Sequence, residues 1–371
     1  MRLGRLLIIV VLALAGGASA ESAPTAGRLV FVQYSHPCPC KAQIAVASPN
    51  GTGRRALTKR YQDSTPAWSP NGRLIAFVRT TARGYHQLHV IKADGTGDRV
   101  LLPDAFGIGG EGGSPPTWSA DGKSVLFLEG IFRCSCPLYP FYGVKKTGWA
   151  LVAVRLKGRP RVRRLFGLPG NVHRRSWFDA RVSPNGRWIV LGSLQFTSTD
   201  TVQGIWLVHP NGTGLHKLAT PNRGDFGAFA WSPDSTRIAY HAYQSSDGSP
   251  CGSFDADSGN VVWVAGADGT APKPLWSWTC GGEEWTGPEI LAESGELHTL
   301  AWAPDGRHVL YSTLDYTAAS TRPNTWGLPL HLVDVGTGEI QPLPIPPIKG
   351  CSGGGVSSGP CTLVDADWTA R

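Results

Sequence analysis

Hydrophobic positions along the chain gather in short runs that are separated by turns rich in Gly, Pro, Asn and Asp. The clearest runs cover residues 74–78, 124–128, 188–191, 237–240 and 308–311, and they are rich in β-branched and aromatic side chains. Short runs of this composition between turn signals are typical of β-strands. The pattern predicts an all-β chain.

Each run follows a turn of one repeated type, in which a Trp-Ser pair leads into Pro-Asx-Gly, with single departures from the pattern. Copies stand at residues 65–72, 116–122, 230–234 and 301–306, and a weaker copy at 181–186 has Val in place of Trp. Self-similarity of this kind indicates a repeat architecture, in which each unit buries its faces against its neighbours.

A second turn type completes each repeat. Asn-Gly or Asp-Gly pairs stand at residues 50–51, 94–95, 211–212 and 268–269, and each follows a further short hydrophobic run. These pairs adopt the positive φ angles that tight hairpins require. Four antiparallel strands per repeat predict the blade of a β-propeller.

Counting the second strand of each repeat gives six blades. The first strand is missing from the blade that begins at residues 28–32, but residues 364–369 match its pattern at the other end of the chain. We therefore expect a six-bladed β-propeller of four-stranded antiparallel blades, closed by the C-terminal strand joining the N-terminal blade. Such closure removes the two open sheet edges.

The Trp-Ser-Pro-Asx-Gly and Asp-Gly turns resemble the TolB-type propeller repeat, a WD-like repeat of exported bacterial proteins. The resemblance covers nearly all of residues 28–369. It implies a fold but no single function, because proteins with this repeat include periplasmic scaffolds, the propeller halves of serine peptidases and some polysaccharide lyases. The chain shows no obvious N-terminal α/β domain of the TolB proteins and no hydrolase domain of the peptidases.

The N-terminal residues have the anatomy of an export signal. Arg2 and Arg5 precede an apolar stretch over residues 6–14, and small residues end at Ala20. This order predicts a signal peptide over residues 1–20 and a propeller over residues 21–371 in the periplasm or outside the cell. No later stretch has the ~18 consecutive apolar residues of a membrane-spanning helix, so we expect no transmembrane segment.

Composition narrows the function classes. The hydrophobic share of 41% and the 14 Trp exclude an intrinsically disordered chain. The formal net charge of +8 is modest and mostly local, and a nucleic-acid partner does not fit an exported protein. No pair of carboxylates stands out as an acid/base couple and none of the 10 His stands in a catalytic pattern. We therefore predict no catalytic residue, no metal site and no cofactor.

The two faces of the predicted propeller differ in their connections. All the short Gly turns fall on one face, whereas the long segments fall on the other, for example residues 244–260, 278–298 and 344–363. Long loops on a rigid scaffold are where binding residues concentrate. We expect the functional site on the long-segment face, together with the mouth of the central channel.

All Cys residues map to the long-segment face. Their even number in an exported chain favours disulfides, and the single residue inside each Cys-x-Cys motif is shorter than the usual spacing of zinc ligands. The candidates are Cys38, Cys40, Cys134, Cys136, Cys251, Cys280, Cys351 and Cys361.

The predicted blade register suggests a disulfide map. Cys251 and Cys280 lie in the same sector, so we expect them to be bonded. The connection entering the closing blade and the second-to-third loop of that blade hold four more Cys. We expect one cluster there, either crosslinked between the two loops or with a local bridge from Cys351 to Cys361. The remaining two, Cys134 and Cys136, either pair with each other or stay reduced.

Two further segments are candidates for contact with a partner. The loop over residues 131–142 carries large apolar side chains, which either pack on neighbouring blades or form a partner surface: Phe132, Tyr139, Phe141 and Tyr142. The hairpin over residues 155–164 carries Arg159, Arg161 and Arg163. Its charges either protect an outer edge strand or contact an anionic surface such as phospholipid or acidic polysaccharide.

These observations favour an exported, non-enzymatic propeller that binds a protein or cell-envelope partner through its long-segment face. The alternative is an enzyme, a lyase or hydrolase that acts on a polysaccharide or peptide at the mouth of the channel. An enzyme should bring His, Arg and carboxylate side chains together there, whereas a binding module should present an apolar or singly charged rim.

Overall fold

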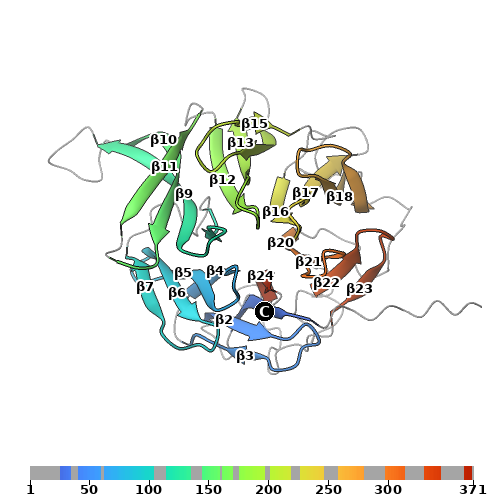
Figure 1. Cartoon of the computed structure of the whole chain (residues 1–371), viewed down its shortest axis with the longest axis horizontal. Coiled ribbons are helices and arrows are strands. Elements are labelled where there is room, and N and C mark those ends of the chain that lie inside the picture. The colour runs from blue at the N-terminus through green and yellow to red at the C-terminus, as the bar shows by residue number, and fades with distance from the viewer. Residues whose placement is uncertain are drawn as a thin grey trace, which may run out of the picture.

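Six four-stranded antiparallel sheets stand as blades around a central axis in the computed structural model (Figure 1). The structure describes residues 26–34, 41–59, 62–103, 114–134, 144–158, 161–169, 175–196, 201–218, 226–245, 258–279, 297–313, 330–343 and 363–369. This architecture confirms the predicted all-β six-bladed propeller.

The blades follow chain order, with the strands given from the axis outward. Blade 1 holds β24 (Leu363–Thr369), β1 (Arg28–Tyr34), β2 (Ala42–Ala47) and β3 (Arg55–Ala56), and blade 2 holds β4 (Gln62–Trp68), β5 (Leu74–Thr80), β6 (His86–Lys92) and β7 (Arg99–Leu102). Blade 3 holds β8 (Thr117–Trp118), β9 (Ser124–Cys134), β10 (Val144–Arg155) and β11 (Val162–Leu168).

The remaining three blades repeat this arrangement. Blade 4 holds β12 (Arg175–Val182), β13 (Ile189–Phe196), β14 (Thr201–Val208) and β15 (His216–Lys217). Blade 5 holds β16 (Phe226–Trp231), β17 (Arg237–Ser245), β18 (Ser258–Gly266) and β19 (Lys273–Thr279). Blade 6 holds β20 (Leu297–Trp302), β21 (His308–Thr313), β22 (Leu330–Asp334) and β23 (Ile340–Pro342).

Blade 1 closes the ring as the sequence predicts. Its innermost strand β24 pairs antiparallel with β1, so that Leu29 lies opposite Trp368. Trp368 is buried, and its indole Nε1 donates a hydrogen bond to the Ala26 carbonyl at 3.2 Å. The two ends of the described chain therefore share one sheet and one buried contact.

The repeated turn owes its sequence to side-chain hydrogen bonds. In blade 2 the Ser69 hydroxyl donates to the Asn71 side chain at 2.9 Å and accepts the Leu74 N–H at 2.9 Å. Gly72, which follows Asn71, has a φ of 63° and donates its N–H to the Ser69 carbonyl at 2.8 Å. Glycine fits this left-handed position, which explains the Ser-Pro-Asx-Gly order.

Motif Trp side chains connect blades 3, 5 and 6 to the blade before them. Trp118 in blade 3 donates its indole N–H to the Ala67 carbonyl of blade 2 at 3.0 Å. Trp302 in blade 6 makes the same bond to the Ala230 carbonyl of blade 5 at 3.1 Å. The motif therefore encodes contact between blades as well as the turn itself.

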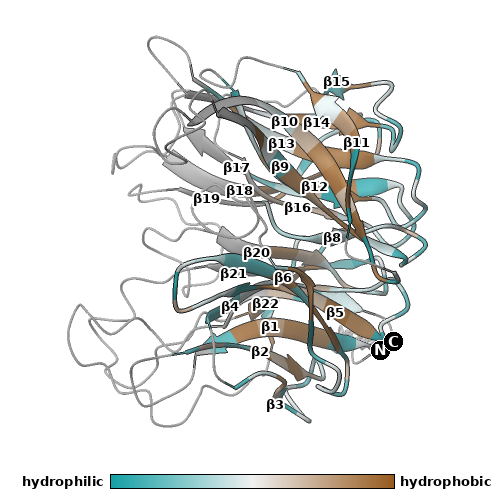
Figure 2. Cartoon of the chain, turned by 90° about the vertical axis from the view of Figure 1, so that its left-hand side faces the viewer, coloured by the Kyte–Doolittle hydropathy of each residue, from teal (hydrophilic) through white to brown (hydrophobic). Residues whose placement is uncertain are grey.

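An arginine at the start of the second strand contacts the following blade at two boundaries, between blades 5 and 6 and between blades 1 and 2. The Arg237 guanidinium lies 4.7 Å from the Trp302 ring and donates to the Gly306 carbonyl at 2.6 Å. Arg28 repeats both contacts with the next blade, 4.8 Å from the Trp68 ring. Neighbouring blades, including these, also pack through apolar faces, and Figure 2 colours many of the strands brown.

The expected loop over residues 131–142 is wrong at its start. Strand β9 continues to Cys134 and β10 begins at Val144, so Phe132 belongs to a strand and lies opposite Lys146. A register shift between Lys146 and Gly148 lets the pairing continue beyond the point where the alternating pattern breaks. Tyr139, Phe141 and Tyr142 lie outside the described residues.

Candidate functional site around the propeller axis

The innermost strands surround the propeller axis, and one position in each of them decides the chemistry there (Figure 1). This position directly precedes the motif Trp or its equivalent. It is Arg181 in blade 4 and Asp367 in blade 1, three blades apart, whereas it is uncharged in the other blades: Ala67, Thr117, Ala230 and Ala301. Two opposite charges therefore belong to opposite sides of the ring.

Arg181 is paired with a carboxylate of its own strand. Its Nε lies 3.1 Å from the nearer oxygen of Asp179, which is buried. The same carboxylate accepts the Ala180 N–H at 2.7 Å. We call Asp179, Arg181 and Asp367 the axial cluster.

Asp367 connects blade 1 to blade 2. Its Oδ2 accepts the backbone N–H of Trp68 at 2.7 Å, and its Oδ1 accepts the N–H of Trp368 at 2.8 Å. Thr117, at the equivalent position of blade 3, accepts the Val182 N–H of the following blade at 3.4 Å. The axial edge of an innermost strand has no neighbouring strand, so these side chains satisfy backbone groups that would otherwise lack a partner.

The environment raises the pKa of both carboxyls in the axial cluster. Burial is the main cause in each case, because it disfavours the charged form. Weaker influences lower these pKa values. At Asp179 they are the Arg181 charge and the hydrogen bond from the Ala180 N–H, and at Asp367 they are two backbone N–H groups and the Arg181 charge. Asp179 and Asp367 can therefore hold a proton to a higher pH than an exposed Asp does.

Irregular pairing accompanies these side chains. The innermost strand of blade 4 shifts register between Trp177 and Asp179, and that of blade 2 shifts between Ser64 and Ala67. Thr65, inside the second shift, has a φ of 48°, which is uncommon for a residue with a side chain. Such bulges redirect side chains next to binding and active sites.

Replacing Arg181 with Gln should make stability more dependent on pH. The folded-state pKa values of Asp179 and Asp367 are raised, so folding favours their protonated forms, and stability falls as pH rises from about 4 through those values. Without the cation both pKa values should rise further. We expect a loss of about 1–3 kcal/mol near pH 7, because Arg181 is partly exposed, and a smaller loss near pH 4. Urea unfolding at both pH values measures the difference, and an equal loss at both would contradict it.

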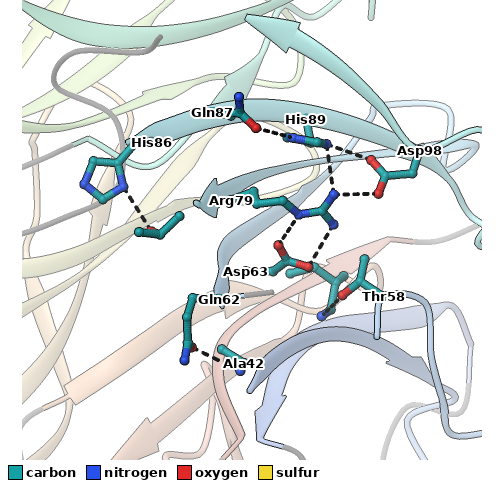
Figure 3. Close-up of polar contacts among 11 residues, drawn as sticks. Ala42, Thr58, Gln62, Asp63, Arg79, His86, Gln87, His89 and Asp98 are labelled. Carbon is teal, nitrogen blue, oxygen red and sulfur yellow. Dashed lines mark hydrogen bonds and ion pairs between the residues drawn. The ribbon is translucent and has the colours of Figure 1, made fainter. Parts of the chain in front are cut away.

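A second polar network crosses blade 2 from its innermost to its outermost strand (Figure 3). The buried Arg79 on β5 lies with its Nε 2.7 Å from Asp63 on β4, and with its Nη1 2.8 Å from Asp98, which directly precedes β7. His89 on β6 lies with its Nδ1 2.7 Å from the second oxygen of Asp98. Each charged group of this network contacts another polar side chain of the network, and such mutual pairing suits a structural role.

Most predicted site residues fall outside the described part of the chain. Among the Cys, only Cys134 is placed, at the end of β9, and its side chain is not described; the others are Cys38, Cys40, Cys136, Cys251, Cys280, Cys351 and Cys361. The disulfide map therefore stays a prediction. Arg159 also lies outside, whereas Arg161 and Arg163 are exposed on the hairpin between β10 and β11.

Sequence reasoning missed the axial cluster. A signal was present in the sequence. In two copies of the repeat, two charged residues with an Ala between them stand directly before the motif Trp or its equivalent: Asp179 and Arg181 before Val182, and Asp365 and Asp367 before Trp368. In the part of the chain that the structure describes, no three His, Cys, Asp or Glu side chains are arranged to hold a metal ion. Over the same ranges, no helix is long and apolar enough to cross a membrane.

Sequence comparison finds partial similarity to TolB proteins. The chain is 37% identical over 76 residues to the Tol-Pal system protein TolB of Zymomonas mobilis and 49% identical over 55 residues to TolB 1 of Novosphingobium aromaticivorans. These matches cover 20% and 15% of this chain, but only 15% and 12% of the two relatives. No family model matches the chain.

Solved structures show the same fold over most of the chain. TolB from Acinetobacter baumannii superposes with a TM-score of 0.59 at 17% identity, over 92% of this chain and 66% of that one. An oligogalacturonate lyase in complex with manganese gives 0.51 at 16% identity, over 85% and 73%. The chain is a TolB-like β-propeller, a fold that binding proteins and enzymes share.

Proposed function

We propose that this TolB-like β-propeller is an exported, non-enzymatic binding module that holds a protein or cell-envelope partner on its long-segment face. The observation that carries the proposal is the difference between the two faces. The first-to-second turns occupy only residues 69–73, 119–123, 232–236 and 303–307. At the opposite end of the blades β19 ends at Thr279 and β20 begins at Leu297, and β23 ends at Pro342 and β24 begins at Leu363. Long connections on a rigid scaffold carry binding residues.

The hydrogen bonds of the axial cluster argue against acid/base catalysis by its carboxylates. Both oxygens of Asp367 accept backbone N–H groups, and Asp179 accepts a backbone N–H and pairs with Arg181. A general acid or base must exchange its proton with a substrate atom at hydrogen-bonding distance. Asp367 instead connects blade 1 to blade 2, and Asp179 holds groups of its own strand. The partial similarity to TolB proteins is consistent with an envelope partner.

Site-specific photo-crosslinking tests the proposal. A crosslinking amino acid at Tyr85 reports on the long-segment face, because Tyr85 is 52% exposed in the connection between β5 and β6. The matched control is Thr96, which is exposed in the opposite turn of the same blade. With the envelope fraction of a bacterium that carries this chain, we expect a discrete adduct from position 85 and none from position 96. Adducts from position 96 alone, or equal adducts from both, would contradict the proposal.

A polysaccharide- or peptide-acting enzyme is the second candidate. The observation that favours it is that burial raises the pKa of two carboxyls at the axis although the Arg181 charge lowers both, because perturbed pKa values recur in active sites. Incubation with oligogalacturonate, followed by absorbance of unsaturated products, tests for a lyase, and release of amines from a peptide mixture tests for a hydrolase. Activity that disappears in Asp179→Asn but survives in the exposed control Asp94→Asn would favour the enzyme.

A further inference from the structure

Positive charge gathers on the outer hairpin of blade 3 and on two segments beside it. Strand β11 is the outermost strand of its sheet; β10 ends at Arg155 and β11 begins at Val162. Seven basic side chains of this region are exposed: Arg99, Lys123, Arg155, Lys157, Arg161, Arg163 and Arg164. We call these seven the basic hairpin patch.

Backbone contacts hold the three segments of the patch together. The Arg99 guanidinium of blade 2 donates to the Leu156 carbonyl in the hairpin turn at 2.8 Å. The N–H of the same Leu156 donates to the Lys123 carbonyl at 3.0 Å. The position of the patch is therefore fixed by the fold, although its charges come from two blades.

A bulge exposes two successive arginines on the edge strand. Val152 lies opposite Arg164 and the preceding Leu151 lies opposite Phe166, so Leu165 is the additional residue. A bulge bends and twists its strand, which lets neighbouring side chains leave the usual alternation. Arg163 and Arg164 both reach solvent as a result.

Few acidic groups balance the patch. Asp121 lies 3.6 Å from Lys123, and the Arg164 charge lowers the pKa of Glu129, which burial raises overall. Within the described ranges, Arg155, Lys157 and Arg161 form no ion pair. A charge or two is enough to protect an edge strand from pairing with another molecule. The short outer strands β3 and β23 carry fewer basic residues than β11. Edge protection therefore does not account for the number of cations.

We propose that the basic hairpin patch docks the propeller on the phosphate surface of an anionic phospholipid bilayer. Five of the seven side chains are Arg, whose planar guanidinium forms paired hydrogen bonds with phosphate. The exposed patch residues lack the aromatic side chains that anchor a protein deeper in a bilayer, so contact stays with the headgroups.

The place of the patch has a consequence for orientation. The hairpin turn lies on the face of the short Gly turns, because it joins the third and fourth strands of its blade. Docking through it leaves the long-segment face turned away from the bilayer. The proposal does not depend on the proposed function, although the two are compatible.

Vesicle co-sedimentation tests the proposal with the full chain. The probes are vesicles of phosphatidylglycerol with phosphatidylcholine, and vesicles of phosphatidylcholine alone. We expect retention on the anionic vesicles only, weakening steeply as salt shortens the range of electrostatic attraction. The triple variant Arg155→Gln, Arg161→Gln and Arg163→Gln should bind about a hundredfold more weakly, since each basic residue near an anionic surface contributes roughly fivefold.

A second triple variant removes the same charge elsewhere on the surface. Lys59→Gln, Arg83→Gln and Lys273→Gln change exposed residues of other segments, and this variant should keep most of the binding. Circular dichroism checks that both variants fold. Equal losses in the two variants, equal retention on neutral vesicles, or binding to a soluble acidic polysaccharide without binding to vesicles would each overturn the proposal.

Discussion

Removing β24 is expected to abolish the cooperative unfolding of the propeller. This strand is the innermost strand of blade 1, and its loss leaves one edge of β1 unpaired at the axis. Trp368, which is 7% exposed, would go with it, and losing a buried Trp side chain alone costs about 3–5 kcal/mol. Asp367, which caps the Trp68 N–H of blade 2, would be lost as well. The damage therefore reaches two blades.

The comparison needs two truncated chains. One ends before Leu363 and lacks β24, and the other ends after Thr369 and keeps all of it. Thermal and urea unfolding followed by circular dichroism should show a single steep transition for the second chain. The first should unfold over a broad range or aggregate, because an unpaired edge invites pairing between molecules. Matching midpoints and slopes for the two chains would contradict the role of β24 in closure.

The sequence was sufficient to predict the fold because strands and turns alternate at short range. Ser69, Asn71 and Gly72 form their turn through contacts within a few residues, so the turn could be recognised without knowing the neighbouring blades. Closure by residues 364–369 was also predictable, because one repeat lacked its first strand. The extension of β9 to Cys134 was missed because pairing there depends on a bulge that no local pattern marks.

The polar clusters were harder to predict because they depend on register and blade order. Asp63 and Arg79 meet because they lie opposite each other on paired strands. The charge of Arg181 lowers the pKa of Asp367, which belongs to a blade three positions away. Neither relation follows from the distance between these residues along the chain. The predicted disulfides raise a different problem, since most of the Cys lie outside the described residues.

Replacing Arg79 with Leu should destabilise the propeller by about 3–5 kcal/mol, the usual cost of leaving a buried charge without its partner. Arg79 forms two hydrogen bonds with Asp63, which is fully buried, at 2.7 Å and 3.1 Å. Asp63→Asn should cost less, about 1–3 kcal/mol, because Arg79 keeps its contact with Asp98. Urea unfolding near pH 7 gives the order of the two variants.

Two measurements show whether Arg79→Leu destabilises the protein by removing an ion pair or by removing packing. One uses the double variant Asp63→Asn with Arg79→Leu, and the other uses a change of pH. If pairing dominates, the double variant should be more stable than Arg79→Leu alone, because no unpaired carboxylate remains. Burial alone would raise the pKa of Asp98, but hydrogen bonds from His89 and Arg79 outweigh it and hold that pKa below its ordinary value. The contribution of Asp98 is therefore present above about pH 4 and is lost as pH falls through its lowered pKa. The difference between the native chain and Arg79→Leu should narrow over that acidic range. A constant difference, together with a double variant no more stable than Arg79→Leu, would show that Arg79 acts through packing alone.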